Sequence, residues 1–503
     1  MLNREATPRS AEFYREHSPS TGVMAFRALI RCMRSSGAVE PPLCFNTIST
    51  HAGMAFTRRN SRHARRIRND LLDSGRNPSP PAYGLGRKRQ RSQEFAIQNL
   101  LFGVFSAGSS PWIEVTIGES IQDLADYAEQ GLIAVEVAQA CQSDPLNSLM
   151  ALAPMRRHTL RKRLAELLAR EENPTKVGGH PQPAEKCLVP IPATIKDYTD
   201  FCADIHQANK VGRQFRPENP LLPNYNSVLI GCPGSASTIQ VSGVPVTRPN
   251  NQWKALDADT PKFGPTKRLD YELELGVCVG TENMPDTAIP DEEPPNHIAG
   301  CCLLKDWSAH DFQAWEYQPL GPFLAKNLQT TICPSVLTSE AMAPFRIAQP
   351  PRPDGDTARL PYLSDQTDQS HGALSVILGV LPSGAIMRER GLEPIRLCCG
   401  PASNMHWMLR KMVAHQASKG CRLQPGDLLD TVTISALSRD GFGKLLELTT
   451  GGKQLLDLPS GETRSSLKDD DKLSLLAVAH PPGNVSMGYG QCTARILPPQ
   501  DNA

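Results

Sequence analysis

Two glutamates separated by one residue are the pair in this sequence best suited to chemistry. Glu272 and Glu274 lie in the run Asp-Tyr-Glu-Leu-Glu at 270–274, between apolar neighbours. If the run is a strand, both carboxylates leave the same face, because side chains alternate along a strand. Two like charges that close repel each other, and a hard divalent cation held by oxygen ligands would relieve that repulsion. The alternative is a solvated strand face with two unrelated glutamates.

Two further acids lie in or after strand-like segments elsewhere in the chain. Asp200 is found within residues 195–201 and Asp306 within residues 303–311. We expect both at strand ends, where their side chains would point into a cleft shared with the paired glutamates. Four carboxylates in one cleft would favour a bound cation. The sequence therefore predicts a site built from three separate segments.

A set of longer motifs runs in order from about residue 95 to the C-terminus. These motifs are DYTDF (197–201), VSGVPVTRP (241–249), LDYELE (269–274), KDWSAHDFQAWEYQPLGPFLAK (305–326), PGDLL (425–429), TIS (433–435), FGKLLEL (442–448) and GYGQC (488–492). In this set and this order the chain resembles the fumarylacetoacetase family, which hydrolyses a carbon–carbon bond in a β-diketo acid. The set is more specific than any single motif in it.

The resemblance implies a metal site with defined ligands. Residues that match the family's ligands for Mg²⁺ and/or Ca²⁺ are Asp200, Glu272, Glu274 and Asp306. Lys326 and Thr330 match residues that complete a second cation site, and Lys326 also matches a group that stabilises developing negative charge. An ordinary surface lysine is the alternative for Lys326. A chelated divalent ion would polarise both oxygens of a β-diketone.

The resemblance also implies residues that bind and activate the substrate. Matches to the family's substrate contacts are Arg216, Gln313, Tyr317 and Thr433. An arginine suits a carboxylate, whereas the amide and hydroxyl groups suit keto or enol oxygens. Glu447 matches the acid that orients the family's catalytic histidine. The alternative for Glu447 is a carboxylate paired with a nearby basic group.

The position of the family's general base departs from the pattern. That histidine lies seven residues after the first aspartate ligand, and the equivalent position here is Gln207. A glutamine can hold a water but cannot accept its proton near neutral pH. His206 precedes it and takes the catalytic role only if the chain shifts locally by one residue. In an extended segment the two neighbouring side chains would point in opposite directions.

Other departures remove polar groups from the expected pocket. Cys202 replaces a substrate-contacting tyrosine, a Gly-Tyr-His-Gly-Arg turn reads Gly-Cys-Pro-Gly-Ser at 231–235, and His310 replaces an arginine. The predicted ligands are all retained. This combination indicates the same scaffold with a different substrate or with weakened hydrolysis.

Composition predicts how the chain is divided. Residues 1–92 hold 17 Lys and Arg against 6 Asp and Glu, in a chain whose net charge is only +1. We expect 1–92 to be a basic, disordered extension. A nucleic-acid-binding or nuclear-targeting patch is a weaker alternative, and a transit peptide beginning at Met24 is another. The resemblance implies a mainly β fold, with a small SH3-like barrel over 93–190 and a larger β-roll or β-sandwich catalytic domain over 191–503.

Local residue patterns predict some of the secondary-structure elements. Alternating Ile113, Val115 and Ile117 before Ile121 predict a β-hairpin. A helix opens near Pro154 with its leucines on one stripe, whereas 349–372 is rich in Pro, Asp, Gln and Ser and predicts a surface loop. The fourteen cysteines contain no metal-binding spacing, and we expect buried free thiols.

Three functions remain open. The first is metal-dependent hydrolysis of a β-diketo acid such as 4-fumarylacetoacetate, as in tyrosine and phenylalanine catabolism. The second is decarboxylation or tautomerisation of an oxaloacetate-like acid in specialised metabolism, and the third is a catalytically impaired metal-binding homologue. The resemblance implies a cytoplasmic homodimer. We expect no membrane partner, since no run of about 18 apolar residues occurs, and a net charge of +1 does not favour nucleic acid.

Overall fold

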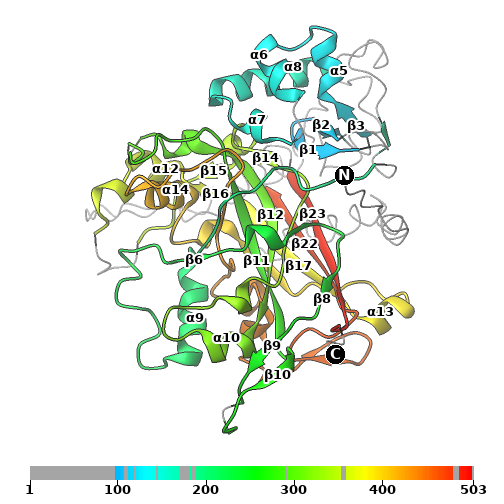
Figure 1. Ribbon diagram of the computed structural model, residues 1–503, viewed down its shortest axis with the longest axis vertical. Coiled ribbons are helices and arrows are strands. Elements are labelled where there is room, and N and C mark those ends of the chain that lie inside the picture. Colours follow the sequence, from blue (N-terminus) through cyan, green and yellow to red (C-terminus); the bar gives the residue numbers. More distant parts are fainter. Residues whose placement is uncertain are drawn as a thin grey trace, which may run out of the picture.

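The computed structural model describes residues 97–106, 111–117, 120–142, 145–169, 182–183, 187–255, 257–290, 292–352, 358–479 and 486–500. The predicted basic extension over 1–92 lies outside these residues. Figure 1 shows a small domain, coloured blue to cyan, at one end of a larger domain built mainly from strands. The mainly β fold that the resemblance implied is confirmed.

The small domain is a four-stranded sheet partly covered by helices. The strands run in the order β1 (Leu101–Phe105), β2 (Trp112–Ile117), β3 (Ser120–Asp123) and β4 (Gln182–Pro183). The helices are α5 (Leu124–Glu129), α6 (Val135–Cys141), α7 (Asn147–Met150) and α8 (Pro154–Ala169). β2 and β3 pair antiparallel, so the predicted hairpin is confirmed, although its turn at 118–119 lies outside the described residues. The predicted helix also begins at Pro154, and its leucine stripe is buried.

An eight-stranded sheet forms the centre of the larger domain. Seven strands follow the order β6 (Gly231–Pro233), β5 (Tyr198–Phe201), β19 (Leu428–Asp430), β11 (Leu269–Val279), β12 (Ile298–Ala309), β13 (Thr330–Ile332) and β7 (Ile239–Val241), and β14 (Leu337–Thr338) pairs with β12 beside this path. Every residue of β11 and β12 is buried. These two strands therefore have protein on both faces.

A second sheet covers one face of the first. Its strands lie in the order β18 (Cys398–Pro401), β17 (Val376–Ser383), β22 (Lys472–Ala479), β23 (Met487–Leu497) and β8 (Val246–Thr247). β11 contacts β17, and β12 contacts both β22 and β23. In Figure 1 the red strands β22 and β23 lie beside the green β11 and β12. The core lies between the sheets.

Helices and short ribbons cover the remaining faces. The helices of this domain are α9 (Ile205–Phe215), α10 (His310–Glu316), α11 (Ser339–Met342), α12 (Gln366–His371), α13 (Ala385–Glu389), α14 (Leu409–Ala417) and α15 (Leu445–Leu448). The ribbons pair β9 (Asn250–Trp253) with β10 (Lys262–Pro265), β15 (Arg346–Ile347) with β16 (Ala373–Leu374), and β20 (Leu456–Asp457) with β21 (Thr463–Arg464). Among the described residues no helix is both long enough and apolar enough to cross a membrane.

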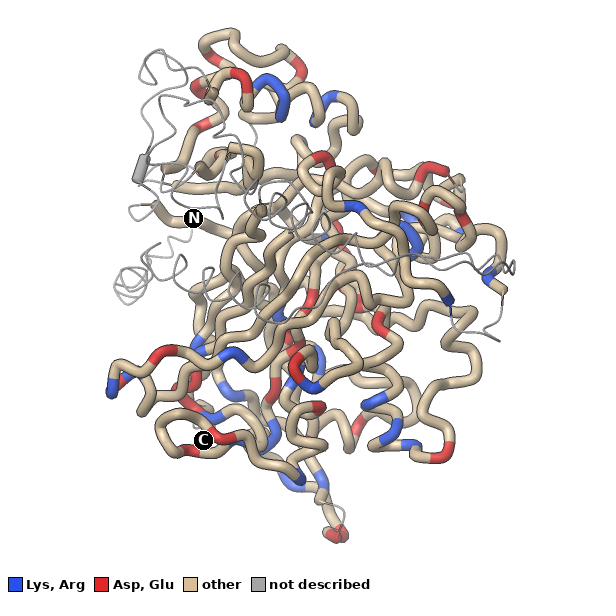
Figure 2. The backbone as a smooth tube through the Cα atoms, turned by 180° about the vertical axis from the view of Figure 1, so that it is seen from behind, with Lys and Arg blue, Asp and Glu red and all other residues tan. Residues whose placement is uncertain are grey.

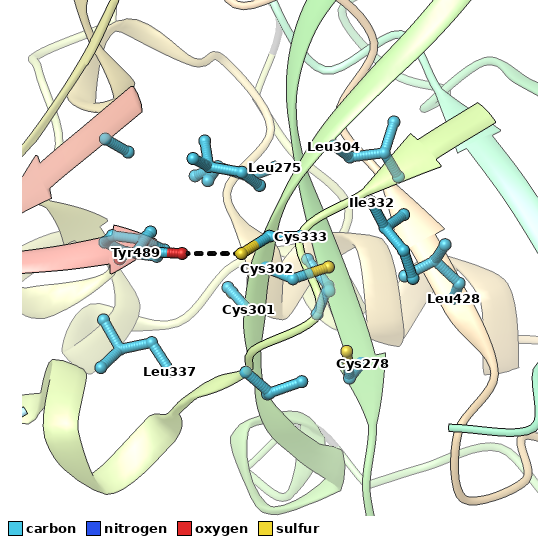
Figure 3. Packing of buried hydrophobic residues seen from close by; sticks show 14 of the residues in the cluster. Leu275, Cys278, Cys301, Cys302, Leu304, Ile332, Cys333, Leu337, Leu428 and Tyr489 are labelled. Carbon is cyan, nitrogen blue, oxygen red and sulfur yellow. Dashed lines mark hydrogen bonds between the residues drawn. The ribbon is translucent and has the colours of Figure 1, made fainter. Parts of the chain in front are cut away.

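Cysteines contribute to the core as small apolar side chains. Figure 3 shows Cys278, Cys301, Cys302 and Cys333 packed among leucines and Tyr489. All four are free and buried, as expected from the sequence. The Cys333 thiol donates to the Tyr489 carbonyl at 3.2 Å, so the polar part of this side chain also has a partner.

The surface loop predicted over 349–372 is only partly present. The segment contains α12, and Gln349 and Asp368 are buried within it. Asp368 lies 3.0 Å from the Lys411 ammonium group of α14, and Gln349 accepts a hydrogen bond from the same ammonium group. Polar composition was misleading here because these polar groups pair with one another inside the fold.

Figure 2 shows acidic and basic positions interspersed over the described chain.

Candidate active site

Strand register brings the predicted acids together. Glu272 of β11 lies directly opposite Asp306 of β12, and Glu274 follows two positions along the same strand. On the edge of β11 opposite to β12, β19 lies between β11 and β5 and pairs its Asp430 with Asp200. Since neighbouring strands are less than 5 Å apart, these positions form one acidic area. The acids lie within the sheet and not only at strand ends.

The ammonium group of Lys326 lies among three of these carboxylates. Its Nζ atom is 2.5 Å from Asp306 Oδ2, 3.1 Å from Glu272 Oε1 and 3.4 Å from Asp200 Oδ2. Lys326 ends the short helix η6 (Leu324–Lys326) and is 8 % exposed, which excludes an ordinary surface lysine. Burial opposes its charge, but the acids outweigh burial and hold its pKa well above the usual value.

Hydroxyl groups and a second lysine hold the acids in place. Thr330 donates to Asp306 Oδ1 at 2.7 Å, and Thr433 donates to Glu272 Oε2 at 2.8 Å. The Lys444 ammonium group lies 3.4 Å from the same Glu272 oxygen. Burial alone would raise the pKa of Glu272, but Lys326 and Lys444 together hold it below its usual value. Sequence reasoning missed Lys444, whose only signal was its place inside the FGKLLEL motif.

Asp430 is a further acid of the site that the sequence did not single out. Oxygen atoms of Asp200, Glu274 and Asp430 all lie within 4.8 Å of one another. Tyr198 donates its hydroxyl to Asp430 Oδ2, and Asp430 is fully buried. Burial, followed by the charges of Asp200 and Glu274, raises the pKa of Asp430 well above its usual value. Only the pairing of β19 with β5 shows that this acid belongs to the site.

These residues fit a hard divalent cation. Both carboxylate oxygens of Glu274 and the Oδ1 atom of Asp200 are buried without a hydrogen-bond partner among the described residues. Burial, with repulsion from Asp200, raises the pKa of Glu274 well above its usual value. Unpaired buried carboxylates are costly, and coordination would satisfy them. Since the donors are all oxygens, the set suits ions such as Mg²⁺ or Ca²⁺ and not a soft metal.

A cavity of about 260 Å³ opens above the acids. Asp200, Glu272, Lys326 and Lys444 line its charged floor. Its other sides come largely from α9, from the segment that follows it and from α10, which lie beside each other in Figure 1. Of the predicted substrate contacts, Arg216, Gln313 and Tyr317 line the cavity, whereas Thr433 reaches the site through Glu272.

Helix α9 presents Gln207 to the cavity and turns His206 away. Asp204 caps the start of the helix, and its carboxylate accepts from the Gln207 backbone N–H at 2.9 Å. The cavity-lining positions of the helix, Gln207, Ala208, Val211, Gly212 and Phe215, recur with helical spacing. His206 is not among them, so a catalytic role for His206 would still require the local shift. Burial, and then Lys210, lower the pKa of His206.

Glu447 is paired with groups other than a histidine. Its Oε2 atom accepts from the Ser435 hydroxyl at 2.6 Å, and its Oε1 atom lies 3.4 Å from the Lys210 ammonium group. Lys210 lies one turn after His206 on α9. The alternative of a carboxylate paired with a nearby basic group therefore describes Glu447 in this structure.

His310 is held between an acid and a predicted substrate contact. Its Nε2 atom lies 3.0 Å from Asp270 Oδ2, and its Nδ1 atom lies 3.3 Å from Gln313 Oε1. Asp270 also accepts backbone N–H groups from Leu445 and Leu446 at the start of α15. His310 thus connects the orientation of Gln313 to the segment that carries Lys444 and Glu447.

Comparisons with known proteins agree on one family. Residues 98–195 match the model of the fumarylacetoacetase N-terminal region, and residues 198–476 match that of the fumarylacetoacetate hydrolase C-terminal region. The fumarylacetoacetases of Rattus norvegicus and Arabidopsis thaliana are each 36% identical over 416 residues, covering 80% of this chain and 96% of theirs. That of Caenorhabditis elegans is 36% identical over 426 residues, covering 81% and 97%.

Solved structures that align with this chain have lower sequence identity to it. A fumarylacetoacetate hydrolase from Exiguobacterium antarcticum aligns with a TM-score of 0.42 at 15% identity, covering 79% of this chain and 99% of its own. A maleylpyruvate hydrolase from Sphingobium sp. SYK-6, in complex with manganese(II) ion and pyruvate, aligns with a TM-score of 0.43 at 12% identity, covering 80% and 100%.

Proposed function

This chain belongs to the fumarylacetoacetase family of carbon–carbon bond hydrolases, and we propose that it cleaves a β-diketo acid in a metal-dependent reaction. The family's substrate 4-fumarylacetoacetate, which yields fumarate and acetoacetate, is the reference compound. The observation that carries the proposal is the set of unpaired buried oxygens on Asp200 and on the neighbouring Glu274, because Asp200 lines the floor of a cavity that Lys326 also lines.

Different residues would bind the metal ion and the substrate in such a reaction. Asp200, Glu272, Glu274 and Asp306, together with Asp430, would hold Mg²⁺ and/or Ca²⁺. Bound there, the ion would polarise the two oxygens of the diketone. Arg216 would bind a carboxylate of the substrate at the cavity's edge.

The chain's own groups would guide bond cleavage. The oxygen of water adds to one carbonyl carbon, the bond from that carbon to the methylene breaks, and its electron pair becomes an enolate that is then protonated at carbon. Lys326 would stabilise the negative charge that develops on oxygen. The Gln207 amide would hold the attacking water, but it cannot take the water's proton. We therefore propose slower hydrolysis than a histidine at this position would give.

The finer features follow the family. We propose a homodimer in the cytoplasm, with tyrosine and phenylalanine catabolism as the reference pathway, and domains divided near residue 190. Leu320 and Phe323, which are 97% and 65% exposed close to η6, support burial of this segment by a second copy. Gln207 favours a second candidate, decarboxylation or keto–enol exchange of an oxaloacetate-like acid, because neither reaction needs an activated water.

The test measures loss of the diketone's near-ultraviolet absorbance and the products formed. We expect chelator to abolish cleavage by the full chain, and Mg²⁺ or Ca²⁺ to restore it. Glu274→Gln should weaken metal binding, measured by calorimetry, by at least about 100-fold, because it removes a charged ligand. Glu282→Gln, at a surface ion pair with Arg422, is the matched control and should leave binding unchanged.

Two results would contradict the proposal. If cleavage continues unchanged in the presence of chelator, the reaction does not depend on a metal ion. Metal binding without cleavage of any diketo acid would leave either the second candidate, if gas release or keto–enol exchange is seen, or a catalytically impaired homologue.

A further inference from the structure

One wall of the cavity is apolar. It is formed by Ala208 and Val211 of α9, Leu221 and Ile230 from the segment after it, and Leu446 of α15. Ala208, Leu221 and Ile230 also pack against the hydrophobic core, which fixes this surface in place. A substrate group that rests on this wall gains by being apolar, because the burial of CH₂ groups is favourable.

Two thiols extend the wall toward the floor. Cys202 and Cys232 both line the cavity. A thiol is only a weak hydrogen-bond donor. Neither can replace the hydroxyl or ammonium group that a carboxylate would need.

The floor has no surplus positive charge. Lys326 and Lys444 both contact Glu272, and Lys326 also contacts Asp200 and Asp306. Together with Glu274 and Asp430, which would also hold the ion, these are five carboxyl groups, so two lysines and one bound divalent ion leave no positive charge in excess. A second substrate carboxylate would find no unpaired cation there.

Arg216 differs from the other cations of the cavity. Among the described residues that line it, Arg216 is the cation with no carboxylate partner, and its Nη2 atom donates to the Pro220 carbonyl at 3.2 Å. It lies at the end of α9 and is exposed to solvent. One available arginine matches one carboxylate.

We propose that the preferred substrate is a β-diketo monoacid whose acyl arm is uncharged and apolar, with the arm on the α9 wall and its single carboxylate at Arg216. This inference rests on the proposed hydrolysis and names its substrate class. Water adds to the carbonyl that carries the arm, the bond to the methylene breaks, and the products are an apolar carboxylic acid and acetoacetate. No other reactant is needed.

A matched pair of substrates tests the arm directly. In 3,5-dioxooctanoate the arm ends in a methyl group, and in 3,5-dioxooctanedioate the same carbon is a carboxylate. We expect kcat/KM for the monoacid to exceed that for the diacid by at least about 10-fold, which is the scale on which apolar pockets discriminate. A diacid preferred by the wild-type protein would overturn this inference but leave metal-dependent hydrolysis intact.

A charge placed on the wall should shift the preference toward the diacid. Val211→Arg puts a cation where the arm rests, and we expect it to favour the diacid by at least about 10-fold relative to wild type. Asn209→Arg adds the same charge to α9 outside the cavity-lining positions and should not change the ratio. An unchanged ratio in Val211→Arg, with metal affinity and melting temperature retained, would show that the arm lies elsewhere.

If neither compound is cleaved, a binding measurement still tests whether the cavity prefers an apolar arm to a charged one. Calorimetry on the Mg²⁺-loaded protein compares butyrate with succinate, the acids that would be released from the two arms. Tighter binding of butyrate supports an apolar arm site even though the proposed hydrolysis has then failed. Tighter binding of succinate, or equal binding, overturns the inference.

Discussion

Gln207 is the residue on which the rate of the proposed reaction depends most. It is 5% exposed and lines the cavity, and the family resemblance predicts the general base at this position. The neighbouring Cys202 thiol lies 3.9 Å from its amide oxygen. An amide in this place can hold a water but leaves it unactivated.

We predict that Gln207→His raises kcat for hydrolysis by about 100-fold, because general-base catalysis contributes on that scale. The measurement is kcat for 4-fumarylacetoacetate at pH 7.5 with Mg²⁺. His206→Ala is the matched control and should change kcat by less than about 2-fold, because His206 does not line the cavity. No gain in Gln207→His together with a large loss in His206→Ala would show that His206 moves into the site.

The sequence predicted the acids more fully than their partners. Glu272, Glu274, Asp200 and Asp306 were recognised from strand alternation and motif. The structure brings three of them around Lys326 and places Glu274 beside Asp200. Asp430 and Lys444 were missed because their place depends on which strands pair and where α15 packs. Such long-range pairing leaves no periodic signal near either residue.

At the scale of elements, α9 is the support on which the cavity wall is built. Gly212 lies on its cavity side and is buried, and a Cβ atom added there would overlap the Pro220 carbonyl. The close approach of helix and following segment therefore requires glycine at this point. Leu221 of that segment and Val211 of α9 both line the cavity.

We predict that Gly212→Ala destabilises the protein by about 1–3 kcal/mol, as overpacking does, and raises KM for the diketo acid more than it lowers kcat. The reason is that the segment after α9 must move while the acids on the sheet stay in place. Denaturant unfolding and steady-state kinetics measure the two effects. Gly264→Ala on β10 meets no atom within 4 Å and should be nearly neutral. A stable Gly212→Ala protein with unchanged KM would show that the segment yields without cost.

Elements with a repeating apolar pattern were predicted well, and those held by polar pairs were not. The β2–β3 hairpin and α8 follow from alternation and from a leucine stripe. In contrast, α12 was missed because Asp368 owes its buried position to Lys411 and Gln349, which are distant in sequence. Pairing of charges inside a fold overrides what composition suggests.

At the scale of the whole molecule, the small domain contains an acid that should make stability depend on pH. Glu114 of β2 is 1% exposed, lies opposite Gly103 of β1, and accepts from the Thr116 hydroxyl at 2.9 and 3.0 Å. Burial raises its pKa to about 8, against an ordinary value of 4.5, and the hydrogen bond from Thr116 only partly offsets this. The folded protein therefore keeps a proton that the unfolded chain has released between these two pH values.

We predict that Glu114→Gln stabilises the protein increasingly as pH rises from 4.5 to 8. Below pH 4.5 both states of the wild type hold the proton, so the neutral amide should make little difference to the melting temperature. As pH rises, the wild type loses the stability contributed by the protonated carboxyl, whereas the amide has no proton to release. Melting temperatures of the metal-loaded proteins at pH 4.5 and pH 9 give the comparison.

Glu166→Gln provides the control for this pH dependence, since Glu166 also belongs to the small domain but lies on the exposed side of α8, 3.7 Å from Arg163. Surface pairs contribute about 0–1 kcal/mol, so its effect should be small at both values of pH. If Glu114→Gln also shifts the melting temperature by the same amount at both values, the Glu114 carboxyl does not titrate in this window. In that case it is ionised throughout, and water must reach the interior of the sheet between β1 and β2.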